Sequence, residues 1–268
     1  MNWSRAKTIL IFMFLATALF QSYVLYTSES KTKNISPEII DSCVELLAKN
    51  QIEVKSDIIP KNNYSVSSAD ADNAVEDYLE FAKLILGTDT KKTAENTFSS
   101  SLGTVSFSGN MFDFNLNLKE GDIKGETSSI SSAKGLLKKL TLDLDGAKES
   151  TNRTDKGYEI TFTDYIDNIP FPDSEVVCVV ENHKITRLYG KWFNIAEKNG
   201  SVKLKTITSV LIDLIKAEVT KPAQITDISL GYIIPENNSY QRSVTLVPVW
   251  RIAFKNGEIL SVDARNPQ

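Results

Sequence analysis

The stretch TVSFSGNMFDFNLNL, residues 104–118, carries the clearest fold signal in the chain. Polar and apolar residues alternate on both sides of Gly109-Asn110, a dipeptide that favours a tight turn between two strands. The apolar set of this hairpin is Val105, Phe107, Phe112, Phe114, Leu116 and Leu118. One face is therefore predicted to be buried and the other solvated, as in an antiparallel sheet that is covered on one side.

Helices are predicted before the strands. A first helix is expected over 37–50, where Ser36-Pro37-Glu38 supplies an N-cap, a proline at the first helical position and an acid in the first turn. A stronger helix is expected over 69–86, because Ser68 can cap it and Gly87 can end it. The hairpin then follows this second helix.

The sequence predicts three consecutive groups of elements, each a helix followed by strands. The first group ends with strands at 93–99 and 104–118. The second group is a helix and three strands, expected at 129–142, 158–162, 175–181 and 184–193. The third group is expected at 204–219, 225–234, 243–254 and 258–263. We therefore predict an α+β fold of repeated units, each a helix plus an antiparallel three-stranded meander.

The N-terminal segment is predicted to be a transmembrane helix over residues 8–28. No charged residue occurs from Thr8 to Ser28, and a helix of this length rises about 30 Å, the thickness of the hydrocarbon core of a bilayer. Arg5 and Lys7 precede the span, so the positive-inside rule places residues 1–7 in the cytoplasm. The expected location is the cell membrane, with a single pass and the C-terminal domains extracytoplasmic.

A cleaved signal peptide is the alternative interpretation, because Ala16-Thr17-Ala18 fits the small-x-small cleavage pattern. The anchor is favoured because cleavage there would leave a mature chain that begins LFQSYVLY. The anchor is also a candidate contact surface. Small residues permit close approach of a neighbouring helix and polar ones can hydrogen-bond to it, so the candidate helix–helix contacts are Ala16, Thr17, Ala18, Gln21 and Ser22.

Two extracytoplasmic domains are expected beyond the span, over residues 29–125 and 126–268. The boundary is placed within 119–128, which is rich in Gly, Ser and Thr. The formal net charge of the chain is −4, the charges are interspersed and no basic stripe is present, so nucleic acid is not an expected partner. The only cysteines are Cys43 and Cys178, for which a single disulfide and two free thiols both stay open, with free thiols favoured.

The residue inventory argues against catalysis and metal binding. His183 is the only histidine and lies on a predicted turn, where a Ser-His-Asp site would be exposed. Ser131-Ser132-Ala133-Lys134 matches the Ser-x-x-Lys pattern of serine acyl-enzymes without its companion motifs. Asp143-Leu144-Asp145-Gly146 opens like a calcium loop, but Lys148 stands where glycine is needed and Thr154 where Glu is needed. No enzyme activity, cofactor or metal is predicted.

Two apolar, proline-bearing segments, 165–172 and 232–235, are candidate outer-surface contacts. Their contact residues would be Ile169, Phe171 and Tyr232. Ordinary packing between a strand end and a helix is the other interpretation, and the favoured one.

The two ends of the chain resemble a known family. The opening MNWSRAKTILIF, residues 1–12, resembles the start of YycI-type regulatory proteins of the YycH/YycI family in Gram-positive bacteria. The segments VPVWRIAF (247–254), NG (256–257) and SVDA (261–264) resemble the end of that family and of PepSY-like modules. The middle is similar only in its order of elements.

This resemblance implies a single-pass, non-enzymatic protein. Its extracytoplasmic part would act with a YycH-like single-pass partner on the sensor histidine kinase WalK (YycG) of the WalK/WalR two-component system, which controls cell-wall metabolism. Association of transmembrane helices would bias the kinase between states. The alternative function is a PepSY-like extracytoplasmic module that binds or inhibits a peptide or protease. An anchored hydrolase is the third possibility, and the residue inventory places it last.

Overall fold

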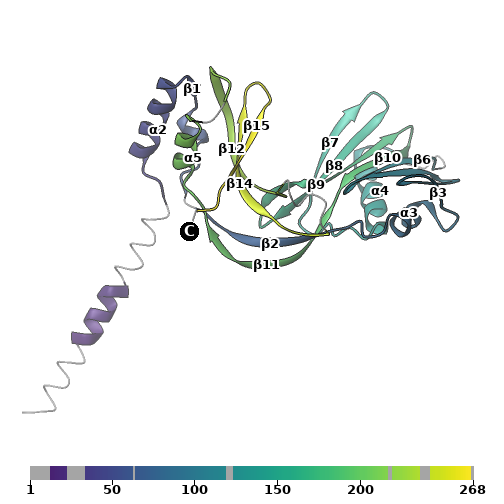
Figure 1. The fold of residues 1–268 in the computed structure, drawn as a ribbon, viewed down its shortest axis with the longest axis horizontal. Helices are drawn as coiled ribbons and strands as arrows, with labels where there is room; N and C mark the ends of the chain where they lie inside the picture. The colour runs from purple at the N-terminus through teal and green to yellow at the C-terminus, as the bar shows by residue number, and fades with distance from the viewer. Residues whose placement is uncertain are drawn as a thin grey trace, which may run out of the picture.

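The computed structural model describes residues 13–22, 34–62, 64–118, 123–216, 219–235 and 242–266. These residues form an α+β fold in which almost all strand pairs are antiparallel, as predicted, with the strands arranged in three sheets (Figure 1).

The largest sheet has eight strands in the order β3-β4-β5-β6-β10-β9-β8-β7. Its strands are β3 (Lys91–Ala94), β4 (Thr97–Ser100), β5 (Gly103–Ser108), β6 (Met111–Leu116), β7 (Lys148–Thr154), β8 (Gly157–Ile166), β9 (Ile169–Glu181) and β10 (Lys184–Lys191). Two helices pack on it, α3 (Tyr78–Leu86) against β4 and β5 and α4 (Glu126–Lys139) against β8.

This sheet corrects the prediction of separate three-stranded meanders. Strand β6 of the first predicted unit pairs with β10 of the second, with Phe114 opposite Leu188. The strands on both sides of the expected boundary at 119–128 therefore share one sheet and one hydrophobic core. Residues 119–122 of that boundary lie outside the described residues.

A second sheet has four strands in the order β1-β12-β14-β15. Its strands are β1 (Ile52–Glu53), β12 (Ala223–Ile233), β14 (Val247–Phe254) and β15 (Ile259–Asp263). Helices α2 (Pro37–Lys49) and α5 (Ile207–Asp213) pack together beside it, and the short helix η1 (Ser56–Ile58) follows β1. The third predicted unit is present here in part, because α5 is followed by the antiparallel strands β12, β14 and β15. The single strand predicted over 243–254 is wrong, since residues 243–245 form a separate strand of another sheet.

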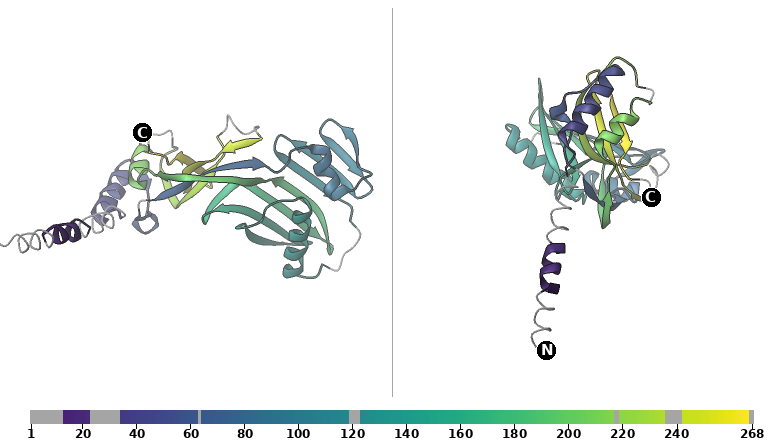
Figure 2. Two further views of the ribbon diagram at one scale, coloured as in Figure 1. Left: turned by 90° about the horizontal axis from the view of Figure 1, so that it is seen from below. Right: turned by 90° about the vertical axis from the view of Figure 1, so that its left-hand side faces the viewer.

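The third sheet, in the order β11-β2-β13, lies between the other two. Its strands are β2 (Ser65–Asn73), β11 (Phe193–Lys203) and β13 (Ser243–Thr245). Strands β2 and β11 pair along their whole length, and Figures 1 and 2 show them running from the region of the four-stranded sheet to the eight-stranded sheet.

Two hydrophobic cores result. One lies among α2, α5, the four-stranded sheet and the inner face of β2 and β11, and contains Trp250, Tyr232 and Phe171. The other lies between the eight-stranded sheet and its two helices, and contains Trp192 and the hairpin residues Phe112 and Phe114. The burial of one face of the 104–118 hairpin is confirmed.

The helix predicted over 69–86 is wrong in its first half. Residues up to Asn73 belong to β2, in which Ala69 and Ala71 are fully buried at alternating positions. The helix begins at Tyr78, because the Asp77 side chain accepts a hydrogen bond from the main-chain N–H of Glu80 at 2.9 Å.

Other elements match the predictions to different degrees. Helix 37–50 and the turns at Gly109-Asn110 and Asn182-His183 are confirmed. The predicted strand 93–99 is instead two strands, β3 and β4, around Asn96, which has a φ of 54°. The helix predicted over 204–219 is the shorter α5, and residues 217–218 lie outside the described residues. The polar strand β7 and most of β11 were not predicted.

Part of the predicted span is described. Residues 13–22 are helical and exposed. Within the described ranges, no helix combines the length and the hydropathy that crossing a membrane requires. Residues 1–12 and 23–28, which complete the predicted cytoplasmic end and span, lie outside the described residues.

Candidate functional site

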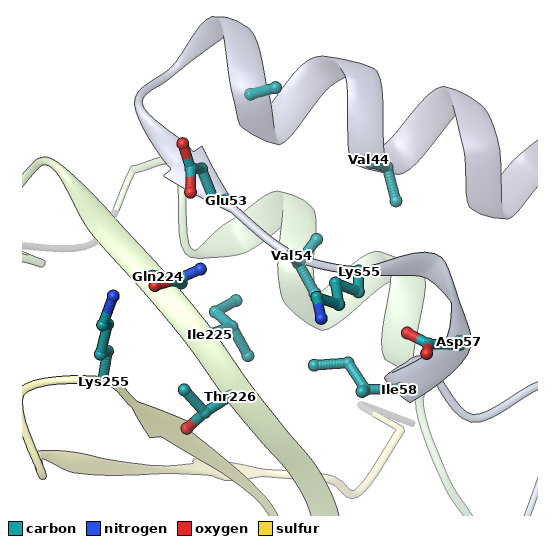
Figure 3. Close-up of a pocket in the computed structure, with 11 residues that line it drawn as sticks. Val44, Glu53, Val54, Lys55, Asp57, Ile58, Gln224, Ile225, Thr226 and Lys255 are labelled. Atoms are coloured by element: carbon teal, nitrogen blue, oxygen red, sulfur yellow. The ribbon is translucent and has the colours of Figure 1, made fainter.

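A groove of about 580 Å³ opens between α2 and β12, on the four-stranded sheet (Figure 3). Its apolar residues come from three elements that are distant in sequence: Val44 from α2, Val54 and Ile58 from the segment after β1, and Ile225 from β12. The side chains of Glu53, Gln224 and Lys255 gather at one end of the groove, and Asp57 lies at the other (Figure 3). The groove thus has an apolar interior and a rim that carries both signs of charge.

The brevity of β1 explains the groove. Ile52 and Glu53 pair in parallel with Ala223 and Gln224, after which the chain leaves the sheet and forms η1. Residues 225–226 of β12 consequently lie beyond the end of β1, beneath the η1 segment. Such a shape suits an extended segment or a protruding side chain of another protein.

The structure places the three predicted outer-surface residues in a hydrophobic core. Phe171 is fully buried, with its ring centroid 6.0 Å from that of Phe193, and Ile169 is half-buried against the same core. Tyr232 is fully buried and donates a hydrogen bond to the main-chain oxygen of Ser67 at 2.7 Å. Phe171 and Tyr232 are therefore unavailable to a partner, and the packing interpretation is correct for them.

The five predicted helix–helix contact residues all lie within the described helix 13–22 and are exposed. The Thr17 hydroxyl donates a hydrogen bond to the main-chain oxygen of Met13 at 2.8 Å, one turn earlier in the same helix. Such a bond satisfies the hydroxyl proton while leaving the side chain at the helix surface. The contacts of Ala16, Thr17, Ala18, Gln21 and Ser22 with another helix stay predictions.

The residues considered for catalysis do not assemble into a reactive set. The Nδ1 atom of exposed His183 lies 2.9 Å from the main-chain oxygen of Ile123. The Lys134 ammonium is 3.1 Å from the carboxylate of Glu149, across to β7, and Ser131 is exposed on α4. Serine-acyl chemistry has no support from this arrangement.

Metal and disulfide chemistry are similarly unsupported. Asp143 accepts a hydrogen bond from the main-chain N–H of Asp145, and no group of metal-ligating side chains occurs within the described ranges. Cys43 and Cys178 are free and buried in different cores. Burial raises the pKa of both thiols, that of Cys178 to about 12, which keeps them protonated and unreactive.

One buried acid was not predicted from the sequence. Asp164 of β8 is only 4 % exposed, and its carboxylate accepts a hydrogen bond from the main-chain N–H of Tyr165 at 2.7 Å. Burial raises its pKa to about 7, and repulsion by Asp143 adds to this increase. The alternation of polar and apolar residues in 158–166 puts Asp164 on the same face as Ile160 and Phe162, and this was the available signal.

Comparison with known proteins then decides the family. A family model described as YycI protein matches residues 30–265. The chain belongs to the YycI family. The family that the two ends of the sequence resemble is thereby confirmed, and the YycI match covers the eight-stranded sheet, the groove and Asp164 together.

Solved structures also resemble this YycI family member. An uncharacterized protein from Eubacterium rectale ATCC 33656 superposes with a TM-score of 0.51 and 13 % identity, over 79 % of this chain and 87 % of that one. YycH from Bacillus subtilis superposes with a TM-score of 0.48 and 15 % identity, over 76 % of this chain and 53 % of that one. The C-terminal domain of Bacillus megaterium YpeB superposes with a TM-score of 0.34 and 10 % identity, over 70 % of this chain and 92 % of that one. No curated protein matches the chain significantly.

Proposed function

We propose that this YycI family protein is a membrane-anchored, non-enzymatic regulator of a sensor histidine kinase that controls cell-wall metabolism. The observation that carries the proposal is the family match over residues 30–265. In this proposal residues 1–7 are cytoplasmic, residues 8–28 form the anchor and the folded part is extracytoplasmic. A YycH-like single-pass protein is the proposed partner.

Regulation without chemistry requires selective binding. A regulator shifts a kinase between two states only by as much as its affinities for those states differ. The chain offers two surfaces for such binding, the exposed helix 13–22 and the groove at α2 and β12.

Co-purification tests the proposal. The full-length chain is solubilised from membranes with its kinase and its YycH-like partner, and the expected result is a stable complex of the three proteins. Exchange of residues 8–28 for an unrelated apolar span should weaken the complex and change kinase autophosphorylation. Unchanged association and kinase output after the exchange would exclude a mechanism that works through the transmembrane helix.

The groove can be tested separately with a matched pair of variants. Ala48→Arg adds a long cationic side chain to the exposed wall of the groove, whereas Ala94→Arg makes the same change on exposed β3, away from the groove. We expect Ala48→Arg to weaken co-purification of the partner and Ala94→Arg to leave it unchanged. Equal behaviour of the two variants would remove the groove from the proposed interface.

The groove also favours a second candidate function, an extracytoplasmic module that binds an extended peptide. An apolar interior next to the end of a two-residue strand provides side-chain pockets beside a sheet, which is how peptides are often held. A soluble fragment of residues 34–268 distinguishes the candidates. Peptide binding by this fragment, with the kinase indifferent to loss of the span, would support the second function over the first.

A further inference from the structure

A small cleft of about 280 Å³ lies where the two hydrophobic cores meet. It is bounded by the loop after α4, by β8 and by β11. Ile166 and Ile195, on its walls, belong to the core of the four-stranded sheet, whereas Leu142 and Leu144 of the loop belong to the core of the eight-stranded sheet. A change in this cleft would therefore act on both halves of the molecule.

Asp164 is the most buried charged group of the cleft, and the regular alternation of β8 places it on the buried face with Ile160 and Phe162. Residues 172–174 of β9 have no partner on β8 at this point, so Thr163 stands opposite Glu175 and Asp164 stands opposite apolar Phe171. The carboxyl faces inward, where it accepts a hydrogen bond from the main-chain N–H of Tyr165. A single donor does not replace the several water molecules that a carboxylate binds in solution.

The charged groups around Asp164 are predominantly acidic. The loop contributes Asp143 and Asp145, β11 contributes Glu197, and the cation lining the cleft is Lys198 of β11. The Lys198 ammonium is already 2.8 Å from the carboxylate of Asp167. It therefore offsets only part of the repulsion that an ionised Asp164 would meet.

Two further groups border this site. Tyr165 lines the cleft, and the ammonium of Lys148 on β7 lies 4.0 Å from the centre of the Tyr165 ring. Lys148 is thus placed over the ring of Tyr165, and Asp164 has no closely paired cation among the described residues.

The loop over Asp164 is held by hydrogen bonds to Trp192 and Asn194. Trp192 Nε1 donates to the main-chain oxygen of Asp143 at 3.1 Å, and the Asp143 N–H donates to Asn194 Oδ1 at 3.1 Å. Gly146 approaches β8 so closely that a Cβ there would lie 3.2 Å from the main-chain oxygen of Tyr165. The loop thus packs on β8 directly beside the buried carboxyl.

We propose that the Asp164 cleft is a proton-operated latch between the two halves of the molecule. With Asp164 neutral, the loop 143–147 and the start of β11 stay closed over β8. Ionisation of Asp164 adds a fourth negative charge beside Asp143, Asp145 and Glu197, which favours water entry and opens the loop. The raised pKa of Asp164 places this change near neutral pH.

Hydrogen–deuterium exchange on the full-length protein tests the latch. We compare the protection of the amides in 143–147 and 194–198 after correction for the intrinsic effect of pH on exchange. This protection should fall by roughly tenfold or more between about pH 5.5 and 8.5, which corresponds to a difference of about one pH unit between the pKa values of Asp164 in the closed and open states. Asp164→Asn, which keeps an acceptor for the Tyr165 N–H but cannot ionise, should abolish this pH dependence. Asp227→Asn, at an exposed position of β12, should retain it.

A direct titration covers the case in which Asp164→Asn does not fold. The carboxyl ¹³C resonance of Asp164 in the unmodified protein should titrate near neutral pH. A midpoint below about pH 5 would overturn the proposal, since an ordinary carboxylate titrates near 4. Wild-type pH dependence of exchange in a folded Asp164→Asn protein would overturn it equally. Neither readout involves the kinase or the partner, so failure of the latch leaves the proposed regulatory function standing.

Discussion

The hydroxyl of Tyr232 donates a hydrogen bond of 2.7 Å to the main-chain oxygen of Ser67. Tyr232 is in β12 of the four-stranded sheet and Ser67 is in β2 of the sheet that continues toward the eight-stranded sheet. This bond therefore joins two sheets across the core, between residues that are 165 positions apart in sequence. Burial raises the pKa of Tyr232 to about 12, so the hydroxyl remains a neutral donor at physiological pH.

Replacing Tyr232 with Phe should destabilise the fold by about 1 kcal/mol, because the Ser67 oxygen loses its donor while the ring still fills the core. Urea denaturation followed by circular dichroism measures this loss. Tyr64→Phe is the matched control, since Tyr64 is exposed, and it should change stability by less than about 0.5 kcal/mol. Equal stability of the Tyr232→Phe and wild-type proteins would show that the bond contributes nothing.

Replacing Phe171 with Ala should cost about 3–5 kcal/mol, because a fully buried ring that packs against Phe193 is removed and a cavity is left. Phe171→Leu keeps most of the volume and should cost less. The same denaturation experiment measures both changes. A loss of partner binding in Phe171→Ala with no loss of stability would instead restore Phe171 as a surface contact.

The start of α3 depends on Asp77. Asp77→Ala should lower stability by about 1 kcal/mol, because the N–H of Glu80 loses its side-chain acceptor. Asp77→Asn retains an acceptor oxygen and should behave nearly as wild type. Thermal unfolding of the three proteins at one pH measures these differences. If Asp77→Asn is as unstable as Asp77→Ala, the negative charge of Asp77, and not its hydrogen bond to Glu80, stabilises the start of α3.

Asp164 should make stability depend on pH. Its pKa rises from the usual 3.8 to about 7 in the folded chain, so the folded state holds a proton that the unfolded state has released. The stabilisation that this bound proton gives the folded state is fully present below about pH 4 and is lost as the pH rises to about 7. The free energy of unfolding falls over this range by roughly 1.4 kcal/mol per pH unit at most.

The variant Asp164→Asn removes this linkage. Its stability relative to wild type should therefore increase between pH 4.5 and pH 7.5, which melting temperatures at several pH values measure. Asp227→Asn, an exposed change of the same kind, should run parallel to wild type. A difference between Asp164→Asn and wild type that is constant over this pH range would contradict the assignment of the shift to Asp164.

Local sequence signals predicted the elements that have a strong periodicity or clear turn and capping residues. The hairpin around Gly109-Asn110 and the helix after Ser36-Pro37 are examples, because turn residues and caps act within a few positions. Residues 69–73 show where this reasoning ends. Their small and acidic side chains are compatible with a helix, but pairing of β2 with β11 and β13 satisfies their main-chain groups and buries Ala69 and Ala71 on one face.

The candidate site depended still more on distant residues. Val44, Val54 and Ile225 line one groove, although no pattern along the chain connects α2 with β12. Phe171 and Tyr232 were predicted as candidate outer-surface contacts, with core packing as the favoured alternative, and only their packing against β11 and β2 decided for the core.

The sequence by itself determined the α+β class, the antiparallel hairpins and the YycI family, since periodicity, turn chemistry and end motifs are properties of neighbouring residues. Only the tertiary structure decided that β6 pairs with β10, that Tyr232 reaches Ser67 and that Asp164 is enclosed at the junction of two cores. Which strands pair depends on how whole sheet and helix faces are buried against one another. The alternation within a single strand indicates that one face is buried, but it does not indicate which element covers that face.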